Sequence, residues 1–213
     1  MEDRARPEAS HAAAGESVTL AVAASVNSSK QDLLRRRGYD RVRIFFRMAI
    51  DLAGGFAPPR WPEGFEVRSV HRRDDDAALH ATLQDAFAEH YRFMPEPLDE
   101  WTQRILAHEH FAPDLSFIVH HHGEAVGAVA NYLMPDVGWV GTLGVRHPWR
   151  GQGIGKALLL HSFDAFHRAG QDKVALGVDS ENAAGATRLY ERAGKRVDQR
   201  HELFEKLVAP TRG

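Results

Sequence analysis

The glycine-rich segment Arg150-Gly151-Gln152-Gly153-Ile154-Gly155-Lys156 has the residue types of an anion-binding turn. The run 138–145 before it reads as a strand, and the apolar run 157–160 after it belongs to a helix. Backbone N–H groups at a helix N-terminus have no intrahelical partner and carry partial positive charge, and glycine lets a phosphate approach them closely. The segment therefore predicts a phosphate site at a strand-to-helix turn.

Two better-known glycine loops do not fit this segment. A Walker A loop ends in Gly-Lys-Ser/Thr, whereas Gly155-Lys156 is followed by Ala157, which has no hydroxyl for magnesium. A Rossmann fingerprint needs Gly-x-Gly-x-x-Gly, whereas Gly151, Gly153 and Gly155 are spaced by two. Neither motif applies, and a glycine-rich turn without any ligand stays open as the alternative.

Two segments together resemble the GNAT-type N-acetyltransferases, which bind acetyl-CoA. The first, Arg150 to Gly155, is similar to the Arg/Gln-x-x-Gly-x-Gly/Ala pyrophosphate loop of that family. The second, 178–194, places an Asn after a predicted strand and then Leu-Tyr-Glu on a predicted helix. Both occur in the family's order, so the resemblance extends over residues 64–208. It implies an α+β fold with a twisted mixed β-sheet flanked by helices.

The same resemblance implies the roles of individual residues. Asn182 would contact the pantetheine arm, and Tyr190 would protonate the departing thiolate. Ala186 lies four residues before Tyr190 and so shares its helix face. An acceptor amine would attack the acetyl-CoA thioester directly, with the oxyanion held by a backbone N–H near the end of the preceding strand and with no metal. The implied cofactor-binding residues are Leu143, Gly144, Val145, Arg150, Gly151, Gln152, Gly153, Ile154, Gly155, Lys156, Asn182 and Ala186.

In GNAT-type enzymes a helix-loop-helix commonly forms one wall of the acceptor site, and the resemblance implies this role for the segment around residues 88–97. Its mixture of His, Tyr, Glu and aromatic residues suits a polar amine substrate. The candidates for the base are His90, whose unperturbed pKa is better suited, and Glu89. A water chain to a backbone carbonyl would serve as well, and simple packing or solvation explains any one of these side chains equally.

Three positions depart from the common family pattern. Pro148 falls one position later than usual, the interval from Asn182 to Tyr190 is one residue longer, and Lys195 stands where an aromatic residue commonly follows Gly194. The first two are similar to the tandem, mycothiol-synthase-like subgroup, whose enzyme makes an acetylated cysteinyl sugar. The identity of the acceptor in this chain is not carried over by that resemblance.

The N-terminal part of the chain contains an apparent partial repeat of the C-terminal part. An ungapped shift of 156 residues superposes six identities: Val18 on Val174, Leu20 on Leu176, Val22 on Val178, Leu33 on Leu189, Arg36 on Arg192 and Gly38 on Gly194. Such a strand-helix-strand piece cannot close a core alone, so we expect it to dock on the following domain or on another subunit.

This pattern divides the chain into five expected segments. They are a mobile tail at 1–16, a partial GNAT-like repeat at 17–52, a linker at 53–62, a GNAT domain at 63–208 and a tail at 209–213.

Composition limits the classes of partner. The formal net charge of -2 and pI near 6.7 provide no basic field for nucleic acid or an anionic membrane. The chain has 0 cysteines, which excludes disulfides, thiolate catalysis and cysteine-ligated zinc. The run His120-His121-His122 does not converge on one ion, because adjacent strand residues point to opposite faces.

No apolar run approaches the roughly 18 residues of a membrane span, so a cytoplasmic location is expected. We expect an acetyl-CoA-dependent N-acetyltransferase acting on a primary amine of a small-molecule or peptide acceptor, as a monomer or homodimer without nucleic acid or membrane partners. The alternative is a non-catalytic acyl-CoA-binding or interaction module of the same fold.

Overall fold

A computed structural model describes residues 18–181 and 196–208. Its contacts divide the chain into two compact units. Of the described residues, the larger unit contains 48–177 and 196, and the smaller contains 18–47, 178–181 and 197–208. The predicted residues Asn182, Ala186 and Tyr190 lie outside the described part of the chain.

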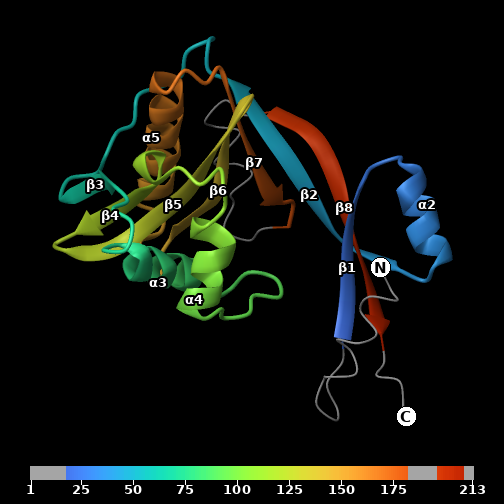
Figure 1. Ribbon diagram of the computed structural model, residues 1–213. Helices are drawn as coiled ribbons and strands as arrows, with labels where there is room; N and C mark the ends of the chain where they lie inside the picture. Colours follow the sequence, from blue (N-terminus) through green and yellow to red (C-terminus); the bar gives the residue numbers. More distant parts are fainter. Residues whose placement is uncertain (1–17, 182–195, 209–213) are drawn as a thin grey trace. The chain divides into compact units, whose positions relative to one another are not determined.

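The larger unit is built on a mixed sheet with the strand order β7-β6-β5-β4-β3 (Figure 1). Antiparallel pairing joins β3 to β4, β4 to β5 and β5 to β6, whereas β6 and β7 are parallel. The strands are β3 (Phe65–Ser69), β4 (Phe117–His121), β5 (Glu124–Met134), β6 (Val137–Val145) and β7 (Lys173–Asp179).

Helices cover both faces of this sheet (Figure 1). A Cβ on Gly138 of β6 would meet the ring of Phe166 in α5, while the neighbouring residue Trp139 packs against the cluster that includes Leu83 of α3. Adjacent strand residues point to opposite faces, so α5 and α3 lie on opposite sides. The helices are α3 (Asp76–Phe87), α4 (Leu98–Trp101), which continues as the π-helix η1 (Thr102–Leu106), and α5 (Ile154–Arg168), with 3₁₀ turns η2 (Pro113–Leu115) and η3 (His147–Trp149).

An ion pair between the exposed Arg68 and the buried Asp75 fixes the start of α3 to β3. Asp75 is 5% exposed and accepts hydrogen bonds from both terminal nitrogens of Arg68, at 2.5 and 2.6 Å, and from the backbone N–H of His71 at 2.7 Å. The Arg68 hydrogen bond, more than the others, holds the pKa of the Asp75 carboxyl below its ordinary value. Of the three consecutive aspartates Asp74, Asp75 and Asp76, Asp75 is therefore a buried structural carboxylate.

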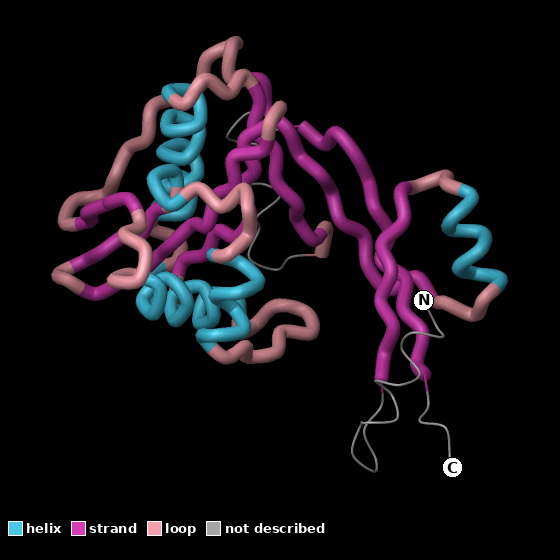
Figure 2. Tube along the Cα trace, in the orientation of Figure 1, coloured by secondary structure: helices cyan, strands magenta, loops and turns pink. Residues whose placement is uncertain are grey.

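The smaller unit contains β1 (Val18–Ser25), α2 (Ser29–Arg36), most of β2 (Asp40–Asp51) and β8 (Arg196–Val208), with β8 between β1 and β2 (Figure 2). Pairing of β1 with β8 is antiparallel over the whole of β1. A small apolar core forms between these strands and α2, from Val22, Ala24, Leu34, Tyr39 and Phe204.

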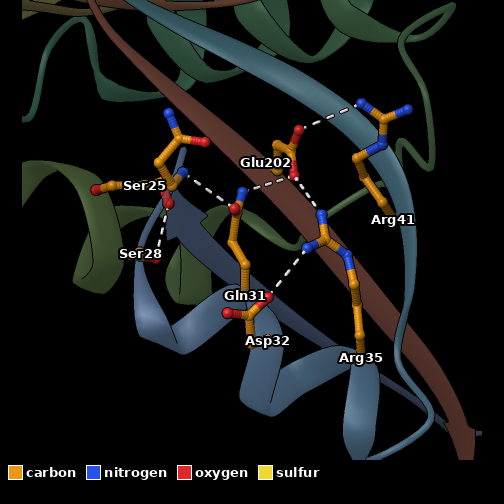
Figure 3. A network of polar contacts seen from close by, with 8 residues as sticks. Ser25, Ser28, Gln31, Asp32, Arg35, Arg41 and Glu202 are labelled. Atoms are coloured by element: carbon orange, nitrogen blue, oxygen red, sulfur yellow. Dashed lines mark hydrogen bonds and ion pairs between the residues drawn. The ribbon is translucent and has the colours of Figure 1, made fainter.

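A polar network centred on Glu202 of β8 lies against α2 (Figure 3). Gln31 donates to its carboxylate at 2.6 Å and Arg41 at 3.2 Å, and Arg35 lies 3.6 Å away. Glu202 is 8% exposed and Gln31 is 5% exposed, so these partners satisfy a carboxylate that burial would otherwise destabilise. The network joins the N-terminal helix to the last strand of the chain.

The predicted α+β fold with a mixed sheet flanked by helices is confirmed. The hairpin turn at His122-Gly123 has φ values of 49° and 83°, as a tight two-residue turn requires. Residues 196–208 form the single strand β8, and Leu98 at the start of α4 is 39% exposed. Among the described residues, no helix is long and apolar enough to cross a membrane.

Replacing Gly138 with Ala should destabilise the fold by about 1–3 kcal/mol, because the new methyl would overlap the fully buried Phe166 ring. Denaturant unfolding measures this free energy. The matched control is Gly177→Ala in the parallel neighbour β7, where the added carbon would meet only Trp139 at 3.9 Å. Equal unfolding midpoints for the two variants would contradict the close packing of α5 on β6.

Candidate functional site

The glycine segment forms the turn between β6 and α5. Gly151 and Gly153 have φ values of 79° and 86°, which residues with a Cβ adopt only at a cost. The first turn of α5 is closed by the Ala157 N–H, which donates to the Gly153 carbonyl at 3.0 Å. The N–H groups of residues 154–156 precede that bond and have no intrahelical acceptor. A Cβ at Gly151 or Gly153 would meet nothing within 4 Å, so space for an anion lies beside this turn.

The parallel strands β6 and β7 pair over only part of their length. Their paired residues are Gly138 to Val140 on β6 and Val174 to Leu176 on β7, whereas β6 continues to Val145. The residues predicted to hold the oxyanion, 143–145, belong to this later part of β6 and lie directly before the glycine turn. Backbone groups on the β7 side of this stretch can therefore face a ligand.

A β-bulge in β6, missed by the sequence reasoning, lies at the start of this stretch. Ala130 pairs with Thr142 and Asn131 with Val140, which leaves Gly141 unmatched. A Cβ on Gly141 would overlap the Tyr132 ring, so that ring packs directly on the bulged backbone. A glycine inside a strand is a known sign of a bulge, and this signal was available in the sequence.

Arg150 folds back onto the protein instead of extending into solvent. Its Nε donates to the Val145 carbonyl at 3.0 Å, and its terminal nitrogens donate to the Ala86 carbonyl at 2.9 Å and to the Glu89 carboxylate at 2.7 Å. The hydrogen bond from Arg150 is the main cause that holds the pKa of Glu89 below its ordinary value. The structure thus brings together one residue predicted for CoA binding and one predicted for catalysis.

Arg146 is neutralised in a similar way. It donates to Asp85 at 2.8 Å and to Glu124 at 2.9 Å, and its backbone N–H donates to the Val126 carbonyl. Both arginines of the β6–α5 connection are thus paired with carboxylates of neighbouring elements. An anion at this turn would therefore be held by backbone N–H groups and by the dipole of α5 rather than by these two arginines.

The predicted acceptor wall follows α3. His90 is half-buried, and its ring centroid lies 4.2 Å from that of Phe87, the last residue of the helix. Tyr91 is 41% exposed and Met94 is 80% exposed. The far end of this loop is fixed at Glu96, whose carboxylate accepts from Arg104 and whose backbone meets His80 and Gln84. The loop therefore has an anchored end and an exposed middle.

Lys156 lies apart from the other residues of the loop. Its side chain is exposed and borders a cavity of about 640 Å³ that extends along α5 to Leu160 and is also lined by the end of β2 and the segment 54–57. Ile154, in contrast, is 1% exposed and packs in the core. Within the loop, exposure is therefore greatest at Gly151, Gln152, Gly153 and Lys156.

A family model described as the acetyltransferase (GNAT) family matches residues 77–194. Among curated proteins, the chain is 33% identical over 176 residues to a mycothiol acetyltransferase of Geodermatophilus obscurus, covering 76% of this chain and 55% of the relative. It is 30% identical over 196 residues to a mycothiol acetyltransferase of Acidothermus cellulolyticus, covering 83% of this chain and 58% of that relative. The chain therefore spans little more than half the length of these relatives.

Solved structures agree with these sequence matches. A GCN5-related N-acetyltransferase from Sphaerobacter thermophilus superposes with a TM-score of 0.82 at 33% identity, over 97% of this chain and 65% of that one. A GCN5-related N-acetyltransferase from Kribbella flavida has a TM-score of 0.62 at 21% identity, over 88% of this chain and 67% of that one. At this identity the match shows the shared fold alone.

Replacing Gly153 with Leu should weaken the binding of CoA about 10-fold to 100-fold, because the side chain fills the open space beside the unpaired N–H groups. Isothermal titration with CoA measures the affinity. The control is Gly170→Leu at the other end of α5, where φ is 83° and the surrounding space is equally open. Both variants carry similar backbone strain, so an equal loss of affinity in both would refute the site.

Proposed function

The chain belongs to the acetyltransferase (GNAT) family, and from that premise we propose that it is an acetyl-CoA-dependent N-acetyltransferase acting on a primary amine. The observation that supports this most is the β6–α5 turn. It places three backbone N–H groups without intrahelical acceptors beside open space, next to the stretch where β6 has left β7. In this proposal the pyrophosphate binds at that turn, and the extended pantetheine arm lies along the part of β6 that is not paired with β7.

In the proposed reaction the acceptor amine attacks the thioester carbonyl of acetyl-CoA. The carbonyl oxygen gains negative charge, which a backbone N–H of the stretch Leu143 to Val145 stabilises. The amine loses a proton to a base, and the sulfur of CoA leaves and takes a proton from Tyr190. Holding both substrates beside one bulged strand makes this attack effectively intramolecular. No covalent enzyme intermediate is required.

The acceptor we propose is a small molecule with a primary amine. The relatives in Geodermatophilus and Acidothermus carry the name mycothiol acetyltransferase, so a cysteinyl sugar is the first amine to test. The acceptor wall is polar and partly exposed at His90, Glu89 and Tyr91, which suits a hydrophilic amine. A cytoplasmic location and a monomeric or homodimeric state belong to the same proposal.

The decisive assay is release of the CoA thiol from acetyl-CoA in the presence of a panel of primary amines. Wild-type protein should release thiol with at least one amine, and Tyr190→Phe should lower kcat about 100-fold or more with little change in the KM for acetyl-CoA. Tight CoA binding without thiol release on any amine, together with an unaffected Tyr190→Phe variant, would establish the non-catalytic acyl-CoA-binding module instead.

His90 is our proposal for the base, and its test is the pH dependence of kcat/KM for the acceptor. Only a neutral imidazole accepts a proton, so wild-type activity should fall in acid. His90→Ala should lose most of its activity at the pH of maximal wild-type activity, and the fall of activity in acid should disappear from its profile. An acid limb that persists unchanged in His90→Ala would assign the proton transfer to another group.

A further inference from the structure

We propose that Arg150 is a positioning residue that fixes the acceptor wall to the cofactor loop, and that Glu89 is its anchor rather than the base. This inference rests on the proposed acetyl transfer, because it concerns the two halves of that same site. It gives a structural role to Arg150, which was expected to bind CoA, and to Glu89, which was a candidate for the base.

The three acceptors of Arg150 come from different elements of the larger unit. The Val145 carbonyl ends β6, the Ala86 carbonyl lies in the last turn of α3, and Glu89 begins the loop after that helix. Three of the five guanidinium N–H donors are thereby used on the protein itself. A planar guanidinium can satisfy three acceptors around its edge, which a lysine ammonium on a flexible stem cannot do in the same geometry.

The end of α3 is an electrostatically suitable place for this cation. Helix carbonyls at a C-terminus carry partial negative charge, and the Ala86 carbonyl that accepts from Arg150 is one of them. The carboxylate of Glu89 adds a full negative charge at 2.7 Å. Arg150 is thus held by charge as well as by hydrogen bonds, and its side chain is only 29% exposed.

The same contacts make Glu89 a poor base. Arg150 lowers the pKa of its carboxyl, so Glu89 stays ionised near neutral pH, but with little tendency to take a proton from an amine. Its side chain is also directed at the loop cation rather than left free for an acceptor. The position of the acceptor wall relative to the thioester consequently depends on the Arg150–Glu89 contact.

The experiment compares Glu89→Gln with Glu124→Gln. Both glutamates are exposed, at 62% and 55%, and both pair with an arginine of the β6–α5 connection, at 2.7 and 2.9 Å. Only Glu89 belongs to the acceptor wall, because Glu124 begins β5 at the hairpin turn. The two substitutions therefore remove the same charge near the cofactor loop, and only one releases the wall.

Steady-state kinetics, with acetyl-CoA and the acceptor varied separately, give the first readout. Glu89→Gln should raise the KM for the acceptor about threefold to tenfold, while the pH profile of kcat keeps its shape. Glu124→Gln should leave the acceptor KM within about twofold of wild type. A fall in kcat of about 100-fold with loss of the acid limb in Glu89→Gln would make Glu89 the base and overturn the proposal.

Amide hydrogen exchange in the free protein gives a second readout that requires no catalytic activity. Residues 86–93 should exchange about threefold to tenfold faster in Glu89→Gln than in wild type or Glu124→Gln. Arg150→Lys should show the same faster exchange, since it keeps the charge but not the three-way geometry. If residues 86–93 exchange at the wild-type rate in both Glu89→Gln and Arg150→Lys, the positioning role is overturned, whether or not the protein transfers acetyl groups.

Discussion

The first turn of α5 provides the interaction on which the functional part of this structure depends. Its N–H groups at 154–156 have no acceptor within the helix, and a buried or ligand-facing polar group needs a partner. Two left-handed glycines before the helix keep the approach to these groups free of side chains. The arginines of the same connection bind carboxylates instead, so the anion site that we propose is formed mainly by backbone groups.

Local features of this site could be predicted from the sequence. The glycine spacing, the strand before it and the apolar run after it are close together in the chain, and the turn, β6 and α5 appear where expected. Contacts between distant residues could not be predicted from the sequence. Arg150 and Glu89 are 61 positions apart, and no periodicity relates them, so the ion pair follows only from the packing of α3 beside the end of β6.

The same limit applies to Asp75 and to the bulge at Gly141. Three consecutive aspartates at the start of a helix usually provide capping and solvated charge, but Arg68 of β3 binds Asp75, whose carboxylate is buried. Gly141 was visible as a glycine within a strand, yet its role becomes clear only once Tyr132 is seen packed on it. In both cases the tertiary partner decides the meaning of a locally ambiguous residue.

In the smaller unit, the core of the N-terminal strand-helix-strand piece includes a strand from the other end of the chain. The last strand, β8, pairs with all of β1, and Phe204 and Glu202 of that strand meet the apolar and the polar side chains of this unit. A piece too small to close a core alone thereby gains one. The suggested duplication stays a prediction, since residues 182–195, which would have to provide the counterpart of α2, lie outside the described residues.

The most direct test of the central claim is a backbone amide NMR titration of the whole chain with CoA. If backbone N–H groups of the β6–α5 turn hold the pyrophosphate, the largest shifts will fall on residues 151–156, and the amides of α2 will stay unchanged. Saturable CoA binding whose shifts spare residues 151–156 would contradict the account.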